Sequence, residues 1–314
     1  MISMITSTRV LYRASWVLVA YTVLIVVWGA WVRLSGSGDG CGDNWPLCNG
    51  MVVPVKSAAK TWIEFAHRAS TAVYGVAILA QLTLVWQKYT KGHPARLWAC
   101  ASLFFTITEA LLGKRLVTAG LVNHSTDLSR MLIMPLHLMN TSLLLASAVM
   151  TAESIQHGDR RRHSLSTAER NWGKILIVAT TVILASGAIA ALGSHLAPSE
   201  SLMQGLAHDL SAESHPAVRL RIIHPILALA IPIALLLCAR PTPDRALHSS
   251  RNIWWGRLAW GTVVAMGVGI ATLTLLAPIW LKLTHLVMAN ILVILFTLCA
   301  FHSLRPASVS GEPL

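Results

Sequence analysis

The segment of residues 14–33 reads ASWVLVAYTVLIVVWGAWVR, an apolar run without an acidic residue or a lysine. A helix of about 20 such residues crosses the hydrocarbon layer of a membrane. The segment follows Arg9 and Arg13, as the apolar part of a signal peptide would. It is too long for that role, and no convincing small-residue cleavage site accompanies it. We therefore expect an uncleaved membrane span.

Seven further apolar segments repeat this pattern. They cover roughly residues 61–85, 97–117, 129–152, 172–192, 218–239, 254–276 and 280–302. The 314-residue chain is 54% hydrophobic and 12% charged, whereas an ordinary soluble domain is about 25% charged. This composition argues against a soluble enzyme and excludes a disordered chain. Because the runs are continuous rather than alternating, they also disfavour a transmembrane barrel. We predict an all-α membrane protein with eight transmembrane helices.

The basic residues fall in alternate loops. Fifteen of the 25 lysines and arginines form one set: Arg9, Arg13, Lys88, Lys91, Arg96, Arg160, Arg161, Arg162, Arg170, Lys174, Arg240, Arg245, Arg251, Arg257 and Arg305. The positive-inside rule places these loops and both termini in the cytoplasm. The net charge of +12 thus reflects the topology of a multi-pass cell-membrane protein, and we expect no nucleic-acid partner.

The spans divide into two sets of four with matching motifs. The second and sixth spans carry Glu64-x-x-His67 and Arg221-x-x-His224, and the fourth and eighth carry His137-Leu and His285-Leu. A parallel duplication of this kind is common in membrane proteins. We predict two pseudo-symmetric four-helix bundles, residues 1–155 and 170–314, joined by a basic cytoplasmic linker over 156–169.

Four of the 13 histidines lie inside predicted spans: His67, His137, His224 and His285. Each follows the outer end of its span by a similar number of residues, which places all four at a depth of about 8–12 Å. A single histidine in a span is often a hydrogen-bonded packing residue, but ionisable groups at membrane depth are costly and mark functional sites. Two histidines per four-helix unit favour haem ligation by two imidazoles over a zinc cluster.

Cations near the outer ends suit the propionates of a haem. The candidates are Arg33, Arg68, Arg130, Arg219 and Arg221, with Arg115 and Lys282 nearby. Each of them also has a simpler interpretation, because long basic side chains reach toward the membrane surface from helix ends.

One carboxylate distinguishes the two halves. Glu64 and His67 share a helix face, whereas the corresponding position in the second half is Arg221. A carboxylate handles protons or stabilises a developing positive charge, so we expect chemistry in the first half and a fixed cofactor in the second. Alternatively, Glu64 pairs with Arg68 at i+4. Glu109, in the third span, is either a second proton-handling group or a partner for Lys114 or Arg115.

The predicted outer loop after the first span contains Cys41 and Cys48. A disulfide is plausible on that oxidising side of the membrane. The C-x6-C spacing differs from the C-x-x-C motif of thiol oxidoreductases.

The ordered set of motifs resembles the haem A synthase family of cytochrome oxidase assembly. The resemblance covers nearly the whole chain and rests on the following motifs: Arg33-Leu-Ser-Gly-Ser-Gly, Cys41…Trp45-Pro-Leu-Cys48, Glu64-Phe-Ala-His67-Arg68, Leu136-His137-Leu-Met-Asn-Thr141, Arg219-Leu-Arg221-Ile-Ile-His224-Pro225 and His285-Leu286. The stretch around Glu109 departs from the segment that other members carry, so the resemblance implies no role for this residue.

The resemblance implies eight helices in two similar halves and a specific set of ligands. His67 and His137 would ligate the substrate haem O, and His224 and His285 would ligate a haem b cofactor. Glu64 matches the catalytic glutamate of the family. Cys41 and Cys48 match a cysteine pair of some members that is thought to form a disulfide.

The reaction implied is the oxidation of the C8 methyl of haem O to the formyl group of haem A by successive hydroxylations. Its partners would be the haem O synthase and an unidentified electron acceptor. The alternatives are a diheme transmembrane electron-transfer cytochrome b and a haem transporter or chaperone. Two permanent haems would need no carboxylate at one site only, so the difference between Glu64 and Arg221 favours the enzyme.

Overall fold

The computed structural model describes residues 7–55, 57–123, 125–158, 167–238 and 250–303. Within these residues all regular structure is helical, apart from an isolated bridge between Cys48 and Met51. The helices are α1 (Thr8–Leu34), α2 (Ala59–Lys88), α3 (Pro94–Thr118), α4 (Arg130–His157), α5 (Thr167–Leu196), α6 (Leu202–Leu210), α7 (Pro216–Leu220), α8 (Ile223–Cys238), α9 (Ser250–Thr274) and α10 (Ile279–Ser303).

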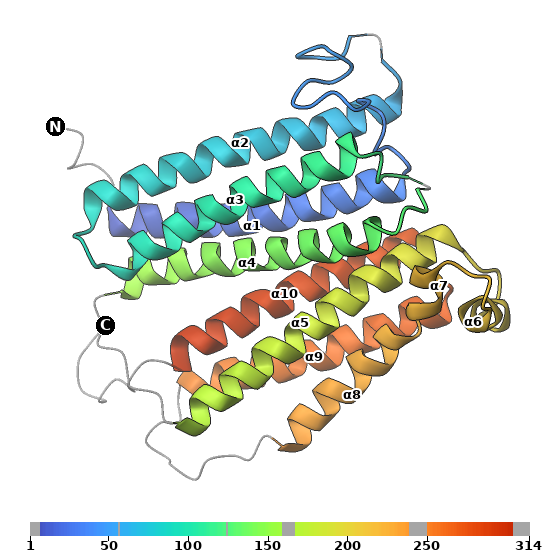
Figure 1. The fold of residues 1–314 in the computed structure, drawn as a ribbon. Helices are drawn as coiled ribbons and strands as arrows, with labels where there is room; N and C mark the ends of the chain where they lie inside the picture. Colours follow the sequence, from blue (N-terminus) through green and yellow to red (C-terminus); the bar gives the residue numbers. More distant parts are fainter. Residues whose placement is uncertain (1–6, 56, 124, 159–166, 239–249, 304–314) are drawn as a thin grey trace.

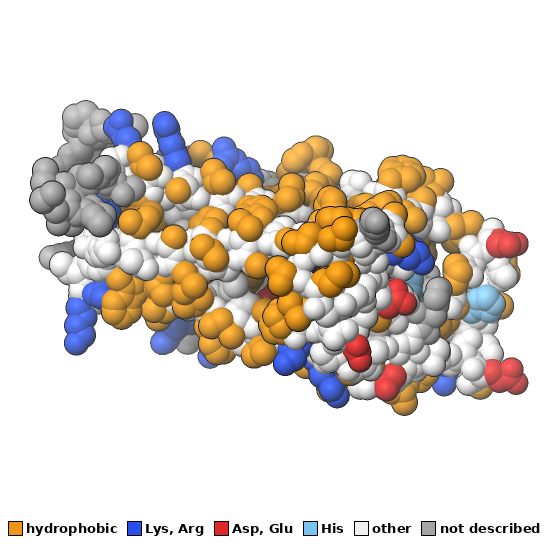
Figure 2. All heavy atoms as spheres, turned by 90° about the horizontal axis from the view of Figure 1, so that it is seen from above, with side chains coloured by type: hydrophobic (Ala, Val, Ile, Leu, Met, Phe, Trp, Pro, Cys, Tyr) orange, Lys and Arg blue, Asp and Glu red, His pale blue; other side chains and the backbone are white. Residues whose placement is uncertain are grey.

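The prediction of eight membrane spans is confirmed, because eight helical segments are long and apolar enough to cross a bilayer. Large hydrophobic side chains such as Val17, Leu24 and Val76 are exposed on their surfaces, as expected for residues that face lipid. Figure 2 shows hydrophobic side chains along the length of one face, with acidic side chains gathered toward one end.

The sixth predicted span, 218–239, is not one continuous helix. It is divided into α7 and α8, and the break follows Arg221, which caps α7. Pro225 explains the break, because it has no amide proton to donate to the carbonyl of Arg221 and its ring clashes with that carbonyl. His224, a predicted ligand, therefore lies in the first turn of α8 and not in the middle of a regular helix.

The sequence interpretation also missed α6, which lies in the predicted polar loop 193–217. Its first turn is fixed by Ser201, whose hydroxyl accepts a hydrogen bond from the amide of Gln204. The pattern Ser-x-x-Gln is a helix-start signature, so the sequence did contain a signal for this helix.

Helices α1 to α4 pack together, since α1 contacts α2 and α4, and α3 contacts the same two helices. Among the later helices, α5 contacts α8, and α9 contacts both α8 and α10. Figure 1 shows the two groups side by side. They meet where α4 contacts α5 and α10 and where α1 contacts α10. A buried cluster that includes Val19, Leu145, Val149 and Val293 fills the junction with α10.

Buried polar side chains join neighbouring helices of the first group. Gln81 on α2 donates to Ser15 on α1 over 2.8 Å, and Ser102 on α3 donates to Ser147 on α4 over 3.2 Å. Contacts of this kind contribute to helix association in lipid, where the hydrophobic effect does not drive it.

The ends of the spanning helices lie at two opposite ends of the molecule. We call the end with the connections 35–58, 119–129 and 197–215 the loop end; α1 begins and α10 ends at the opposite end (Figure 1). Much of the basic set that predicts orientation, including Arg160–Arg162, Arg240, Arg245 and Arg305, lies outside the described residues, as does most of the linker 156–169. The cytoplasmic location of the termini stays a prediction.

Candidate functional site

The four predicted ligands lie near the loop end of their helices. His67, His137, His224 and His285 come six to eight residues after the first residues of their spans, which are Ala59, Arg130, Pro216 and Ile279. With a rise of about 1.5 Å per residue, the four histidines share a level about 9–12 Å from these helix starts.

His224 and His285 lie side by side, edge to face, at a separation that matches two imidazoles on one metal ion. Their ring centroids are 6.2 Å apart and the ring planes are inclined by 71°. A ligating nitrogen lies ~2.0 Å from its metal and ~1 Å from its own ring centre, so two imidazoles on opposite sides of one ion are separated by about 6 Å. Nδ1 of His224 lies 3.1 Å from the hydroxyl of Ser186, which leaves Nε2 free for a ligand.

His67 and His137 are the corresponding residues of the first group, at the same level on α2 and α4. Nδ1 of His67 is buried and has no hydrogen-bond partner, and the same holds for Nδ1 of His285. Buried polar atoms are nearly always satisfied in folded proteins, so these atoms fit a site that takes a further group. In the described part of the chain no three His, Cys, Asp or Glu side chains form a metal-binding cluster.

A glycine of the preceding spanning helix faces each histidine, a feature that the sequence interpretation did not include. The distances run from the position that a glycine Cβ would occupy to Cε1 of the imidazole. They are 3.0 Å for Gly29 and His67, 3.8 Å for Gly113 and His137, 3.0 Å for Gly187 and His224, and 3.1 Å for Gly269 and His285. The sequence shows a glycine within each odd-numbered span, but only the packed structure shows which histidine that glycine faces.

Glu64 is 3% exposed and is held by two partners. It accepts hydrogen bonds from Nε and Nη2 of Arg68, at 3.1 and 2.6 Å, and from the amide of Cys41 at 2.8 Å. The pairing of Glu64 with Arg68, one of the two alternatives from the sequence, is therefore present. It leaves the carboxylate one helical turn from His67, toward the loop end.

Arg68 also fixes the loop above α2. Its Nη1 donates to the carbonyls of Asn44 and Leu47 over 2.6 and 2.7 Å. The expected disulfide between Cys41 and Cys48 is confirmed within this loop.

Arg221, the counterpart of Glu64, anchors a different loop. Its guanidinium pairs with Asp209 on α6 and donates to the carbonyls of Ala197 and Gly205 over 2.7 and 3.1 Å. Arg68 and Arg221 are thus both engaged by loop groups, and each of them also pairs with a carboxylate.

Arg33 and Arg130 have buried donors without partners. Nη1 of Arg33 and Nε of Arg130 are buried and make no hydrogen bond. The charges of Arg130 and Lys282 both act on Arg33, so three cations from α1, α4 and α10 come together at the loop end. Arg219, by contrast, is exposed.

Glu109 contacts α4 and not the end of its own helix. It accepts hydrogen bonds from the side chains of Asn140, at 2.6 Å, and Thr141. Its Oε1 lies 3.4 Å from Nδ1 of His137. The partners expected for an ion pair, Lys114 and Arg115, are not those that the structure gives to Glu109.

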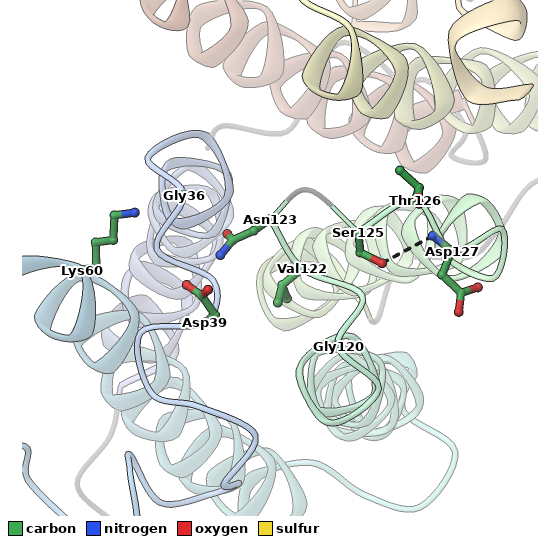
Figure 3. Close-up of a pocket in the computed structure, with 9 residues that line it drawn as sticks. All are labelled: Gly36, Asp39, Lys60, Gly120, Val122, Asn123, Ser125, Thr126 and Asp127. Carbon is green, nitrogen blue, oxygen red and sulfur yellow. Dashed lines mark hydrogen bonds between the residues drawn. The ribbon is translucent and has the colours of Figure 1, made fainter. Parts of the chain in front are cut away.

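A polar pocket of about 900 Å³ opens at the loop end of the first group of helices. Figure 3 shows Asp39 and Lys60 on one side and Asn123 and Ser125 on the other. None of the four histidines lines it. The carbonyls of Asn123 and Ser125 accept hydrogen bonds from Arg130, so the pocket borders the group of three cations.

Several known proteins are similar to this chain in sequence. A protein of Thermus thermophilus named "Protoheme IX farnesyltransferase" is 33% identical over 301 residues, which cover 93% of this chain but 48% of that protein. The chain thus spans about half the length of this relative.

Two relatives carry the name "Heme A synthase". The protein of Bacillus licheniformis is 28% identical over 247 residues, 74% of this chain and 76% of the relative. That of Shouchella clausii is 35% identical over 128 residues, 41% of this chain and 40% of the relative. The profile of the COX15-CtaA family, described as "Cytochrome oxidase assembly protein", matches residues 12–297. Because this match covers most of the sequence, the chain belongs to the COX15-CtaA family of cytochrome oxidase assembly proteins.

Proposed function

We propose that this protein is a haem A synthase, which oxidises the C8 methyl of haem O to a formyl group by two successive hydroxylations. The observation that carries the proposal is the set of four histidines at one level, paired between α2 and α4 and between α8 and α10. The relatives named "Heme A synthase" support the same activity. The two pairs support a division into two pseudo-symmetric halves, residues 1–155 and 170–314.

The second half fits a resident haem b held by His224 and His285. Their centroid separation of 6.2 Å and the contact of Ser186 with Nδ1 of His224 both suit axial ligation through the remaining ring nitrogens. When bound, haem b would supply one-electron transfer. The protein's part is to fix the two imidazoles and to exclude water from the site.

The first half takes haem O as its substrate, with His67 and His137 as axial ligands. Glu64 lies on the same face of α2 as His67, and its hydrogen bonds with Arg68 fix the position of its carboxylate. A fixed carboxylate stabilises positive charge that develops nearby and accepts protons released from the methyl group. Each hydroxylation would take its oxygen atom from water and release two protons and two electrons, and loss of one water after the second would give the formyl group. The electrons would leave through the second half to an acceptor outside the protein.

Among the cations proposed for propionates, Arg33 and Arg130 are favoured. Their unpartnered buried donors suit a carboxylate, and three neighbouring cations would be stabilised by an anion between them. We add Lys282 to this group. Arg68 and Arg221 are assigned to loop anchoring, and Arg219 remains a candidate for the second half.

We propose a protoheme farnesyltransferase, the haem O synthase, as the partner that supplies the substrate. The relative with that name matches this chain over 48% of its own length, so sequence similar to this chain occurs within a protein named for that transferase. Transfer would take place within the membrane, because the ligands of the first half lie at membrane depth.

The test compares Glu64→Gln with Arg68→Gln, which break the same ion pair from its two sides. Each variant is expressed in a host that makes haem O, purified in detergent, and its haems are identified by chromatography and mass. We expect Glu64→Gln to retain haem O and haem b but to form no haem A. Arg68→Gln keeps the carboxylate and should retain at least tenfold more product.

Three results would overturn parts of this proposal. Normal product from Glu64→Gln would remove Glu64 from the reaction. Equal losses in both variants would reduce Glu64 to a loop anchor. Unmodified protein that carries two haem b groups and leaves added haem O untouched would be a diheme electron-transfer cytochrome.

A further inference from the structure

The glycines that face the histidines do not all approach the rings equally. A methyl group on Gly29, Gly187 or Gly269 would lie 3.0, 3.0 or 3.1 Å from the nearest ring carbon, closer than nearly all real side-chain contacts. A methyl group on Gly113 would lie 3.8 Å from His137, an ordinary van der Waals contact. Three rings therefore leave too little room for a methyl group on the facing glycine, and the fourth leaves room for one.

Close packing against a ring is not a general property of glycines in these helices. Gly75, Gly173, Gly256 and Gly267 are also helical, and a Cβ on any of them would meet no neighbouring atom within 4 Å. Glycine weakens a helix interior relative to alanine. We therefore explain the glycine opposite each predicted ligand by the space that the imidazole occupies beside it.

The tight contacts limit how the rings move. An imidazole that leaves no room for a methyl group on the facing helix has little space to shift toward that helix, and a bond to iron would oppose movement the other way. The ring is then held in one position, because well-packed protein interiors deform little. His137 has no such stop at Gly113. Its close neighbour on α3 is the side chain of Glu109, 3.4 Å from Nδ1, and a side chain can move with the ring, so His137 can withdraw from an iron ligand position toward α3.

We propose that Gly29, Gly187 and Gly269 are positioning residues that fix their partner imidazoles, and that His137 is the ligand that yields when haem enters or leaves the first half. This inference rests on the proposed function, in which the first half exchanges substrate for product and the second keeps its haem. One fixed ligand, His67, keeps the substrate oriented while the other ligand opens.

The first experiment compares Gly269→Ala with Gly267→Ala, two residues away on the same helix. Both are purified from a host that makes haem b and haem O, and gel filtration verifies that they are folded. Haem b and the farnesylated haems are chemically distinct, so extraction and chromatography assign each effect to one half. We expect Gly269→Ala to lose at least half of its haem b, or the low-spin electron paramagnetic resonance signal of that haem, while Gly267→Ala retains both.

Identical haem b content and spectra in the two variants would overturn the positioning role. Should Gly269→Ala fail to accumulate, Gly187→Ala tests the same role opposite His224, with the same readouts and the same control.

The second experiment measures the transfer of haem to apomyoglobin, a haem scavenger. From the unmodified protein we expect farnesylated haem to transfer at least tenfold faster than haem b. Gly113→Ala should slow that transfer several-fold, because its methyl group fills the space beside His137. Equal transfer rates for the two haems, or no effect of Gly113→Ala, would overturn the role of His137.

Failure of the proposed function gives a different result. Unmodified protein without haem b, or unable to take up haem O, would overturn the function and this inference together. Normal haem content combined with unchanged glycine variants would overturn the inference alone.

Discussion

The first and second halves anchor their loops with opposite charges at the same position. Glu64 and Arg221 both lie three residues before a histidine. Glu64 receives hydrogen bonds from Arg68 and the amide of Cys41, whereas Arg221 pairs with Asp209. Both residues tie a polar loop to the helix that carries the ligand. The difference shows that the structural role tolerates either sign of charge.

The structural role alone therefore does not explain why only one half has a carboxylate beside its histidine. In the first half the cation is supplied by Arg68, one residue after His67, and it donates to loop carbonyls as Arg221 does. Each half thus has an arginine that donates to loop carbonyls and pairs with a carboxylate. The carboxylate of the first half, Glu64, lies on the helix of the histidine, whereas that of the second half, Asp209, lies on α6. We assign this difference in position to the reaction.

Removal of one predicted haem ligand at a time gives the strongest test of whether the two halves bind their haems independently. We expect His67→Ala to abolish bound haem O and haem A but to leave haem b in place, and His224→Ala to abolish haem b. An imidazole is the metal-binding group in each case, and alanine supplies none. Haem extraction and chromatography measure both outcomes.

The control for this comparison is His208→Ala, in a histidine of α6 away from both pairs. It should leave both haems unchanged. Loss of both haems from either ligand variant would contradict two independent sites, and would indicate a single shared site or a folding defect.

Much of the fold follows from local sequence, since a run of about 20 apolar residues has few alternatives to a membrane helix. The common level of the four histidines also follows, because helical rise converts sequence position to depth. The division between α7 and α8 could have been predicted from Pro225. The glycine contacts could not, because they depend on how neighbouring helices rotate about their axes.

The partners of the arginine side chains were the part of the site that the sequence predicted least well. Arg68 and Arg221 have the same sequence signature as Arg33, a basic residue near a helix end. Their use as loop anchors depends on carbonyls of Asn44, Leu47 and Ala197, whose positions are set by the folded loops. Backbone acceptors of this kind leave no trace in side-chain patterns.

The second prediction concerns the anchor of the second half. Arg221→Gln should destabilise that half by about 3 kcal/mol, because removal of one partner leaves a largely buried carboxylate, that of Asp209, unpaired. We expect haem b to be released at a lower temperature while the farnesylated haems are retained as before. Absorbance during heating, followed by extraction of the haem that remains bound, measures this difference.

Charge reversal supplies a matched control. The double change Arg221→Asp with Asp209→Arg keeps one ion pair and should recover part of the loss. A release temperature of Arg221→Gln equal to that of the unmodified protein would contradict the anchoring role.

The smallest expected effect concerns the disulfide, which the described part of the second half does not contain. Cys41 and Cys48 close a short loop, with seven residues of sequence separation, and a cross-link of this length contributes roughly 2–3 kcal/mol. In the double variant Cys41→Ser and Cys48→Ser, Arg68 still holds the carbonyls of Asn44 and Leu47.

The loss should therefore be partial and confined to the first half. We expect a lower release temperature for the farnesylated haems, faster proteolysis of the loop, and an unchanged release temperature for haem b. Reduction of the unmodified protein with a thiol should reproduce the result, which separates the cross-link from the substitutions. If haem b were released earlier as well, the loops of the two halves would be coupled, and the halves could no longer be treated as independent sites.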